Sequence, residues 1–201
     1  MEDTVTPLDW HAINLPHPHE TVSGDGYVAQ VGADDALFVI IDGLGHGPKA
    51  AAAAKAAVDA VQAFPAEAPT VMMDRLHRVL RGTRGAVVTI ACLNLQTGSL
   101  TWTGIGNVSA TVLRVADDGS YDSDRLLLRG GVVGFKIPTV KVFKTTFQRG
   151  DTLLLASDGI RSDFLNDVPA DLSSTETAQH VMQHYRRETD DATIIIVRYA
   201  S

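Results

Sequence analysis

The sequence predicts an α+β fold, a sandwich built from antiparallel strands and covered by a few helices. Segments rich in β-branched residues alternate with short turn sequences, and other segments carry helical patterns. Strands joined by such short turns run antiparallel, because a parallel return needs a long crossover. No internal repeat or low-complexity linker interrupts the chain, so we expect one domain over residues 1–201.

The strand pattern covers most of the chain. Strands are predicted at residues 27–31, 36–41, 86–93, 99–105, 109–115, 140–147, 152–157 and 193–199. The sequences GADD, QTGS, ADDGS and QRGD each suit a tight reversal between neighbouring strands. Residues 1–20, which end in PHPHE, lack this pattern, and we expect them to be loosely ordered.

Three segments have the periodicity or end signals of helices. Residues 47–64 begin with Pro48 in the first turn, where proline is favoured, and continue through an alanine run. Residues 70–81 carry one apolar stripe at helical spacing. Ser173 and Glu176 form a capping box, and the helix that they start has an apolar face extending to Tyr185.

The bulk composition excludes several classes of protein. Of the 201 residues, 45% are hydrophobic and 20% are charged, as in an ordinary globular domain. Without a long apolar stretch or a signal peptide, we expect no membrane partner. The single cysteine, Cys92, cannot form an internal disulfide, which fits a reducing cytoplasm. The net charge is −7 and no dense Lys/Arg cluster is present, so we expect no nucleic-acid partner.

Five aspartates stand in local motifs, most of them at the ends of apolar strands. They are Asp25 in VSGDGY, Asp42 in FVIIDG, Asp158 in LLLASDG, and Asp190 and Asp191 in DDATIIIV. Carboxylates on rigid strand ends can lie close together when cations bridge them. Carboxylate and carbonyl oxygens suit Mg²⁺ or Mn²⁺ better than zinc. The sequence therefore predicts a two-metal site that could activate a water and clamp phosphoryl oxygens.

The segment IIDGLGHGPKA has a second interpretation, as a phosphate-binding glycine loop between a strand and a helix. Its glycines follow the spacing G-x-G-x-G rather than G-x-G-x-x-G, and GK[ST] is absent. A nucleotide-binding regulator therefore remains an alternative, which affinity for ATP or GTP without divalent metal would support. In the same segment, His46 could pass a proton to a leaving alkoxide or could serve only the local loop geometry.

Taken in order, the motifs GD, DGLGHG, SDG and DDAT resemble the metal-dependent protein phosphatase (PPM) family, in its bacterial SpoIIE-like branch. The resemblance runs from about residue 22 to the C-terminus. It implies two antiparallel sheets flanked by helices, with the metals at one end. It also implies a serine/threonine phosphatase in which a hydroxide held by two metals attacks the phosphorus of phosphoserine or phosphothreonine. Phosphorylated STAS-domain proteins of a stressosome are the implied partners, dephosphorylation resets the stress signal, and we expect a monomer.

The resemblance also implies roles for individual residues. Asp42 would bridge both metals, the Gly43 carbonyl and Asp25 would bind one of them, and Asp158 and Asp190, with Asp191 as the alternative, would complete the second.

One feature of the family is missing here. Eukaryotic relatives bind the substrate phosphate with an arginine near the N-terminus, whereas no arginine precedes Arg75 in this chain. The phosphate is therefore expected to rest mainly on the metals and their waters. A hypothesis of another class is a catalytically degenerate phosphatase fold that binds phosphoprotein partners without turnover.

Overall fold

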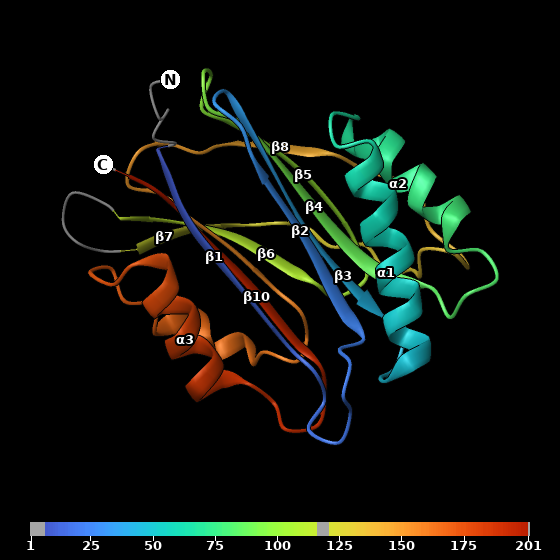
Figure 1. Ribbon diagram of the computed structural model, residues 1–201. Coiled ribbons are helices and arrows are strands. Elements are labelled where there is room, and N and C mark those ends of the chain that lie inside the picture. Colours follow the sequence, from blue (N-terminus) through green and yellow to red (C-terminus); the bar gives the residue numbers. More distant parts are fainter. Residues whose placement is uncertain (1–6, 116–120, 201) are drawn as a thin grey trace, which may run out of the picture.

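The central strands are unbroken apolar runs because both of their faces are covered. In the computed structural model, which describes residues 7–115 and 121–200, two sheets pack face to face and helices cover their outer faces (Figure 1). Strand β3 (Asp35–Gly43) illustrates the pattern. Phe38 and Ile40 pack into the core between the sheets, while Val39 and Ile41 pack into the core under the helices.

Each sheet has five strands within the described residues, and all ladder pairs are antiparallel. The first sheet has the order β1 (Leu8–Leu15), β10 (Ala192–Tyr199), β9 (Thr152–Ala156), β6 (Ser109–Val115) and β7 (Tyr121–Arg125). The second has the order β2 (Asp25–Val31), β3, β4 (Ala86–Asn94), β5 (Ser99–Ile105) and β8 (Phe143–Thr146). The expected sandwich of two antiparallel sheets flanked by helices is thus confirmed.

The helices form the two outer layers. Helices α1 (Pro48–Ala63) and α2 (Pro69–Val79) cover the second sheet, and α3 (Ser174–Tyr185) covers the first (Figure 1). A short 3₁₀ helix spans Ser162–Asn166. Buried alanines of α1, such as Ala53 and Ala57, let this helix approach β2 and β3 closely. Helix α3 begins with the predicted capping box, in which the Ser173 side chain accepts from the Glu176 N–H.

Residues 8–15 form strand β1, so the expectation that residues 1–20 are loosely ordered is wrong for this part of the chain. Leu8–Leu15 pairs with β10 along its whole length, from Leu8 opposite Tyr199 to Leu15 opposite Ala192. The strand lies at a sheet edge and is only partly buried, so it lacks the apolar run of a central strand.

Two of the turn predictions are not confirmed. The sequence QRGD joins β8 to β9, which belong to different sheets, so it links the two layers rather than neighbouring strands as expected. The sequence ADDGS occupies residues 116–120, which lie outside the described residues. Strand β7, which follows it, was not predicted.

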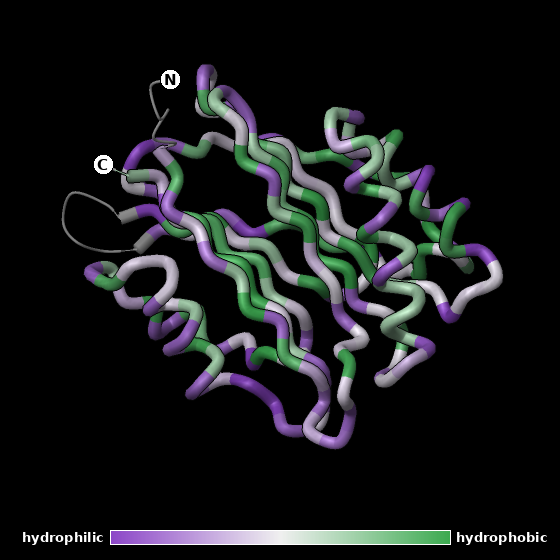
Figure 2. The backbone as a smooth tube through the Cα atoms, viewed as in Figure 1, coloured by the Kyte–Doolittle hydropathy of each residue, from purple (hydrophilic) through white to green (hydrophobic). Residues whose placement is uncertain are grey.

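The hydropathy of the chain follows these layers. Hydrophobic residues run along the central strands, and hydrophilic residues gather in the connecting loops and on the outer helix faces (Figure 2). None of the described helices combines the length and the apolar character that crossing a bilayer requires.

Candidate metal centre

The register of β2 and β3 places the first two predicted acids side by side. Asp25 is the direct cross-strand partner of Asp42. By strand alternation, Asp42 shares the face of Phe38 and Ile40, which points between the sheets. Both carboxylates therefore lie at one end of the space between the two sheets.

The other acids reach this end from the opposite sheet. Asp158 follows β9 and Asp190 precedes β10, and these two strands are neighbours. The Ser157 N–H donates to the Thr193 carbonyl at 2.9 Å, which extends the pairing beyond the strand end. Asp42, Asp158 and Asp190 together line a cavity of about 470 Å³. The two sheets thus contribute acids to one site.

Glycines beside these acids allow the backbone segments to converge. A Cβ at Gly43 would collide with the carbonyl oxygen of Ala50 in α1, and the Gly43 N–H donates to Gly24 at 3.0 Å. A Cβ at Gly159 would collide with the carbonyl oxygen of Asp191. Gly43 and Gly159, which directly follow Asp42 and Asp158, therefore serve close packing at the site.

Burial and mutual repulsion disfavour charge on these carboxylates. Burial raises the pKa of Asp42 to about 9, and the nearby charges of Asp25, Asp158, Asp190 and Asp191 add to the rise. Burial likewise raises the pKa of Asp25 to about 7, against the opposing effect of the Ser157 and Thr193 hydroxyls. Such a cluster is stable in its ionised form only where positive charge compensates it.

The paired acids at the start of β10 occupy different environments. Asp190 lines the cavity, and burial also raises its pKa. Asp191 is only 2% exposed and accepts a hydrogen bond from the His17 N–H at 2.8 Å. Its Oδ2 would lie 2.6 Å from a Cβ at Gly24, next to Asp25. This placement favours Asp190 as the acid that faces the cavity, with Asp191 behind it.

The cavity has further walls that the sequence did not identify. Asn107 lines the cavity and donates to Asp158 Oδ2 at 2.7 Å. Leu44, Val87 and the segment 130–132 complete the wall. A neighbouring cavity of about 310 Å³ continues along 130–132 to Phe135, whose side chain is exposed. These residues carry no motif, and only the fold brings them to the acids.

His46 does not line the cavity. Its Nδ1 pairs with Glu20 Oε1 at 2.9 Å, and its ring stacks on His17 with the centroids 4.8 Å apart. These contacts hold the loop before α1 against the segment after β1, which favours the local structural role of His46 over proton transfer.

The residues present fit divalent cations. Asp25 Oδ2 and Asp191 Oδ2 are buried, and neither has a hydrogen-bond partner within the described residues. In the same part of the chain, no three His, Cys, Asp or Glu side chains are gathered closely enough to surround one ion by themselves. Mg²⁺ requires only one or two carboxylates and keeps several waters, so hard oxygen donors in this open arrangement suit it.

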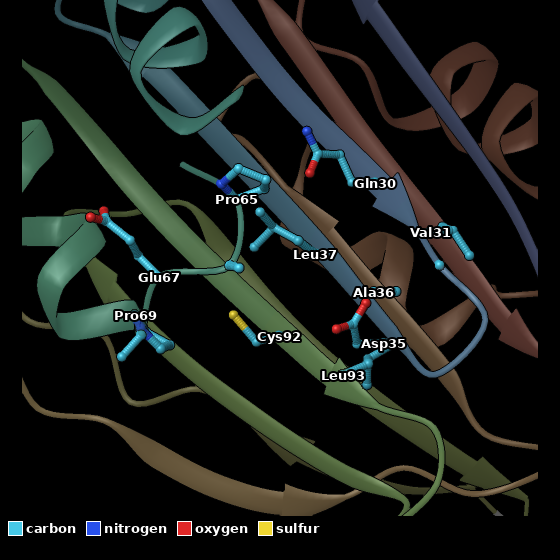
Figure 3. Close-up of a pocket in the computed structure, with 13 residues that line it drawn as sticks. Gln30, Val31, Asp35, Ala36, Leu37, Pro65, Glu67, Pro69, Cys92 and Leu93 are labelled. Carbon is cyan, nitrogen blue, oxygen red and sulfur yellow. The ribbon is translucent and has the colours of Figure 1, made fainter. Parts of the chain in front are cut away.

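A larger cavity of about 590 Å³ lies at the opposite end of β3 and contains none of the predicted acids (Figure 3). Its lining includes Cys92, Glu67 and Asp35. Burial raises the pKa of the Cys92 thiol to about 11, and Glu67 forms an ion pair with Arg75. This cavity therefore lacks an activated nucleophile.

Solved structures of known proteins share this architecture. The structure of RsbX in complex with magnesium matches this chain with a TM-score of 0.86 and 21% sequence identity, and the match covers 96% of each chain. A structure whose description concerns the bacterial stressosome matches this chain with the same TM-score and 26% sequence identity. This match covers 95% of this chain and 99% of the other. This architecture is the PP2C-type phosphatase fold, which the solved structures of the SpoIIE phosphatase domain of Bacillus subtilis and of the serine/threonine phosphatase PstP of Mycobacterium tuberculosis also have.

The family described as stage II sporulation protein E (SpoIIE) matches residues 32–200, and the chain belongs to it. The phosphoserine phosphatase RsbX of Bacillus subtilis is 21% identical over 178 residues, which are 88% of this chain and 87% of RsbX. The expected SpoIIE-like membership is confirmed.

Proposed function

We propose that this protein hydrolyses phosphoserine and phosphothreonine on protein substrates with the help of two divalent cations, Mg²⁺ or Mn²⁺. The observation that carries the proposal is the cavity between the sheets, to which both sheets contribute acids in a chain of the SpoIIE family. When bound, the cations would supply Lewis-acid activation of a water and neutralise the phosphoryl oxygens.

Different residues of the chain would have different roles at the metal site. Asp42 would bridge the cations, with Asp25 and the Gly43 carbonyl on one side, and Asp158 and Asp190 on the other. The Asn107 amide would hold the Asp158 carboxylate in one orientation. Asp191 would position the segment after β1 through the His17 N–H. Ligands fixed in this way avoid reorganisation during the reaction.

The proposed substrates are phosphorylated STAS-domain proteins of a stressosome. RsbX, a phosphoserine phosphatase, and the structure described under the bacterial stressosome both support this assignment. Dephosphorylation would then reset the stress signal. The protein would act in the cytoplasm, as a monomer. The exposed Phe135 beside the cavity would contact the protein around the phosphorylated residue.

The experiment that tests this function compares two substrates, p-nitrophenyl phosphate and a phosphorylated STAS-domain protein. Hydrolysis is measured with Mn²⁺, with Mg²⁺ and with chelator. We expect activity that requires metal and a clear preference for the phosphoprotein. Hydrolysis of p-nitrophenyl phosphate but not of the phosphoprotein would contradict the proposed stressosome substrates and would still support phosphatase activity.

The degenerate, binding-only alternative predicts a different result. Such a protein would bind metal and the phosphoprotein but release no phosphate. The presence of every predicted acid at one end of the sandwich favours the enzyme.

A further inference from the structure

An arginine lies beside the rim of the acidic cavity. Arg84 comes two residues before β4, and the next residue, Gly85, accepts a hydrogen bond from the Leu44 N–H at 3.1 Å. Ala86 then pairs with Gly43 in the ladder between β3 and β4. The backbone around Arg84 therefore runs next to the loop that carries Asp42 into the site.

The guanidinium group of Arg84 covers Gly45, which is part of the cavity lining. A Cβ at Gly45 would lie 2.9 Å from Arg84 Nη1 and 4.0 Å from Cζ. Gly45 also has a φ of 81°, a conformation that side chains disfavour. The close approach of the guanidinium is thus possible because this residue is glycine.

The hydrogen-bonding capacity of Arg84 is almost unused. Its side chain donates one long hydrogen bond, from Nη1 to the Leu44 carbonyl at 3.5 Å, and it forms no ion pair within residues 7–115 and 121–200. A guanidinium has five N–H donors in a fixed planar fork. Arg75, Arg114 and Arg161 differ in this respect, because each pairs with a carboxylate.

A phosphate monoester that enters this cavity meets several carboxylates. Bound cations would compensate this negative charge inside the cavity. A guanidinium group at the rim would compensate it from the cavity entrance. The planar fork of arginine matches two phosphate oxygens, and such charge-assisted pairs are stronger than neutral hydrogen bonds. Arg84 has the charge, the free donors and the position for this contact.

We infer that Arg84 binds the phosphoryl group of the substrate through its non-bridging oxygens at the rim of the metal cavity. The inference rests on the proposed phosphatase function and adds a phosphate anchor supplied by the loop before β4. It differs from the expectation that phosphate rests mainly on the metals and their waters.

The test compares Arg84→Gln and Arg84→Lys with the wild type. Inorganic phosphate is titrated calorimetrically into each Mg²⁺-loaded protein. We expect Arg84→Gln to weaken phosphate binding by about ten-fold to a hundred-fold, with a smaller loss for Arg84→Lys, which keeps the charge but lacks the fork. The KM for a phosphoserine peptide should rise in parallel, with a smaller change in kcat, and Mg²⁺ affinity should stay unchanged.

Arg81→Gln is the matched control. Arg81 is exposed three residues earlier, and its side chain forms no hydrogen bond or ion pair in the part of the chain that the structure describes. This variant removes the same charge from the same loop region, and we expect phosphate affinity equal to that of the wild type.

Several results would overturn the inference. They are wild-type phosphate affinity in Arg84→Gln, an equal loss in Arg81→Gln, or no phosphate binding by the wild type. A matching loss of Mg²⁺ affinity would also overturn it, because Arg84 would then support the loop and not the phosphate. Failure of the proposed function would look different, since the wild type would bind phosphate through Arg84 but hydrolyse no phosphoester.

Discussion

At the scale of the residue, the central feature is a set of aspartates that the fold brings close together. Burial and mutual repulsion disfavour the ionised forms of these aspartates. The pKa of Asp42 is raised to about 9 and that of Asp25 to about 7, with burial as the largest cause in both. An enzyme that needs these groups ionised therefore depends on cations to make them so.

Without metal, the protein should lose stability as pH rises. The folded state keeps protons on Asp42 and Asp25 that the unfolded chain, with a pKa near 3.8, releases. Their contribution is fully present below pH 3.8 and is lost as pH rises towards 9. In Asp42→Asn, which cannot ionise there, the loss should be smaller. Thermal melts in chelator at pH 6 and pH 8.5 should differ by on the order of 5 °C for the wild type. Equal decline in both proteins would contradict this account.

Asn107 should matter for metal affinity because it orients a ligand. Asn107→Ala removes the donor to Asp158 Oδ2, and we expect metal to bind about ten-fold more weakly. Calorimetric titration with Mn²⁺ measures this change. Asn94→Ala is the control, because Asn94 binds Thr97 at the far end of β4. Unchanged affinity in Asn107→Ala would assign the residue to the turn alone.

At the scale of the element, strand ends and tight turns position the acids. The sequence predicted the buried central strands well, because their apolar runs reflect burial on both faces. It missed β1 and β7, the two edges of the first sheet: polar residues interrupt the sequence LDWHAINL of β1, and the sequence YDSDR of β7 is largely polar. An edge strand is covered on fewer sides than a central strand, so its local hydrophobic pattern is weak, and the partner of β1, strand β10, is also distant in sequence.

Gly43 is one of the residues that allow α1 to approach the site closely. Gly43→Ala would drive a methyl group into the Ala50 carbonyl, and overpacking of this kind costs about 1–3 kcal/mol. We expect a melting temperature lower by about 3–10 °C. Gly130→Ala is the control, because Gly130 also lines the cavity but has no atom within 4 Å of an added Cβ. Equal melting temperatures for the two variants would show that the contact is relieved without cost.

At the scale of the whole molecule, the acids come from both sheets. Asp25 and Asp42 belong to one sheet, whereas Asp158 and Asp190 adjoin strands of the other. The motifs named these residues from sequence alone. The sequence did not show the wall formed by residues 130–132, or that Asp190 rather than Asp191 lines the cavity. Those facts depend on how the two sheets stack, which no local pattern encodes.

Because both sheets contribute acids, metal binding should stabilise them together. The two tryptophans lie in different sheets, Trp10 in β1 and Trp102 in β5. Trp10→Phe and Trp102→Phe each leave one reporter, and within each variant its fluorescence should melt together with the far-UV circular dichroism. Mg²⁺ at 100 times its Kd should add about 2.7 kcal/mol to the free energy of unfolding. A shift of only one sheet's reporter would contradict a site shared between the sheets.

The measurement that tests the central claim most directly is phosphoserine-peptide hydrolysis by wild type and Asp42→Asn at saturating Mn²⁺ or Mg²⁺. Asp42 is the proposed shared ligand of the two cations, so its replacement should lower kcat/KM by at least about a hundred-fold while the protein stays folded. Near-normal activity in the folded variant would contradict a metal centre built on Asp42.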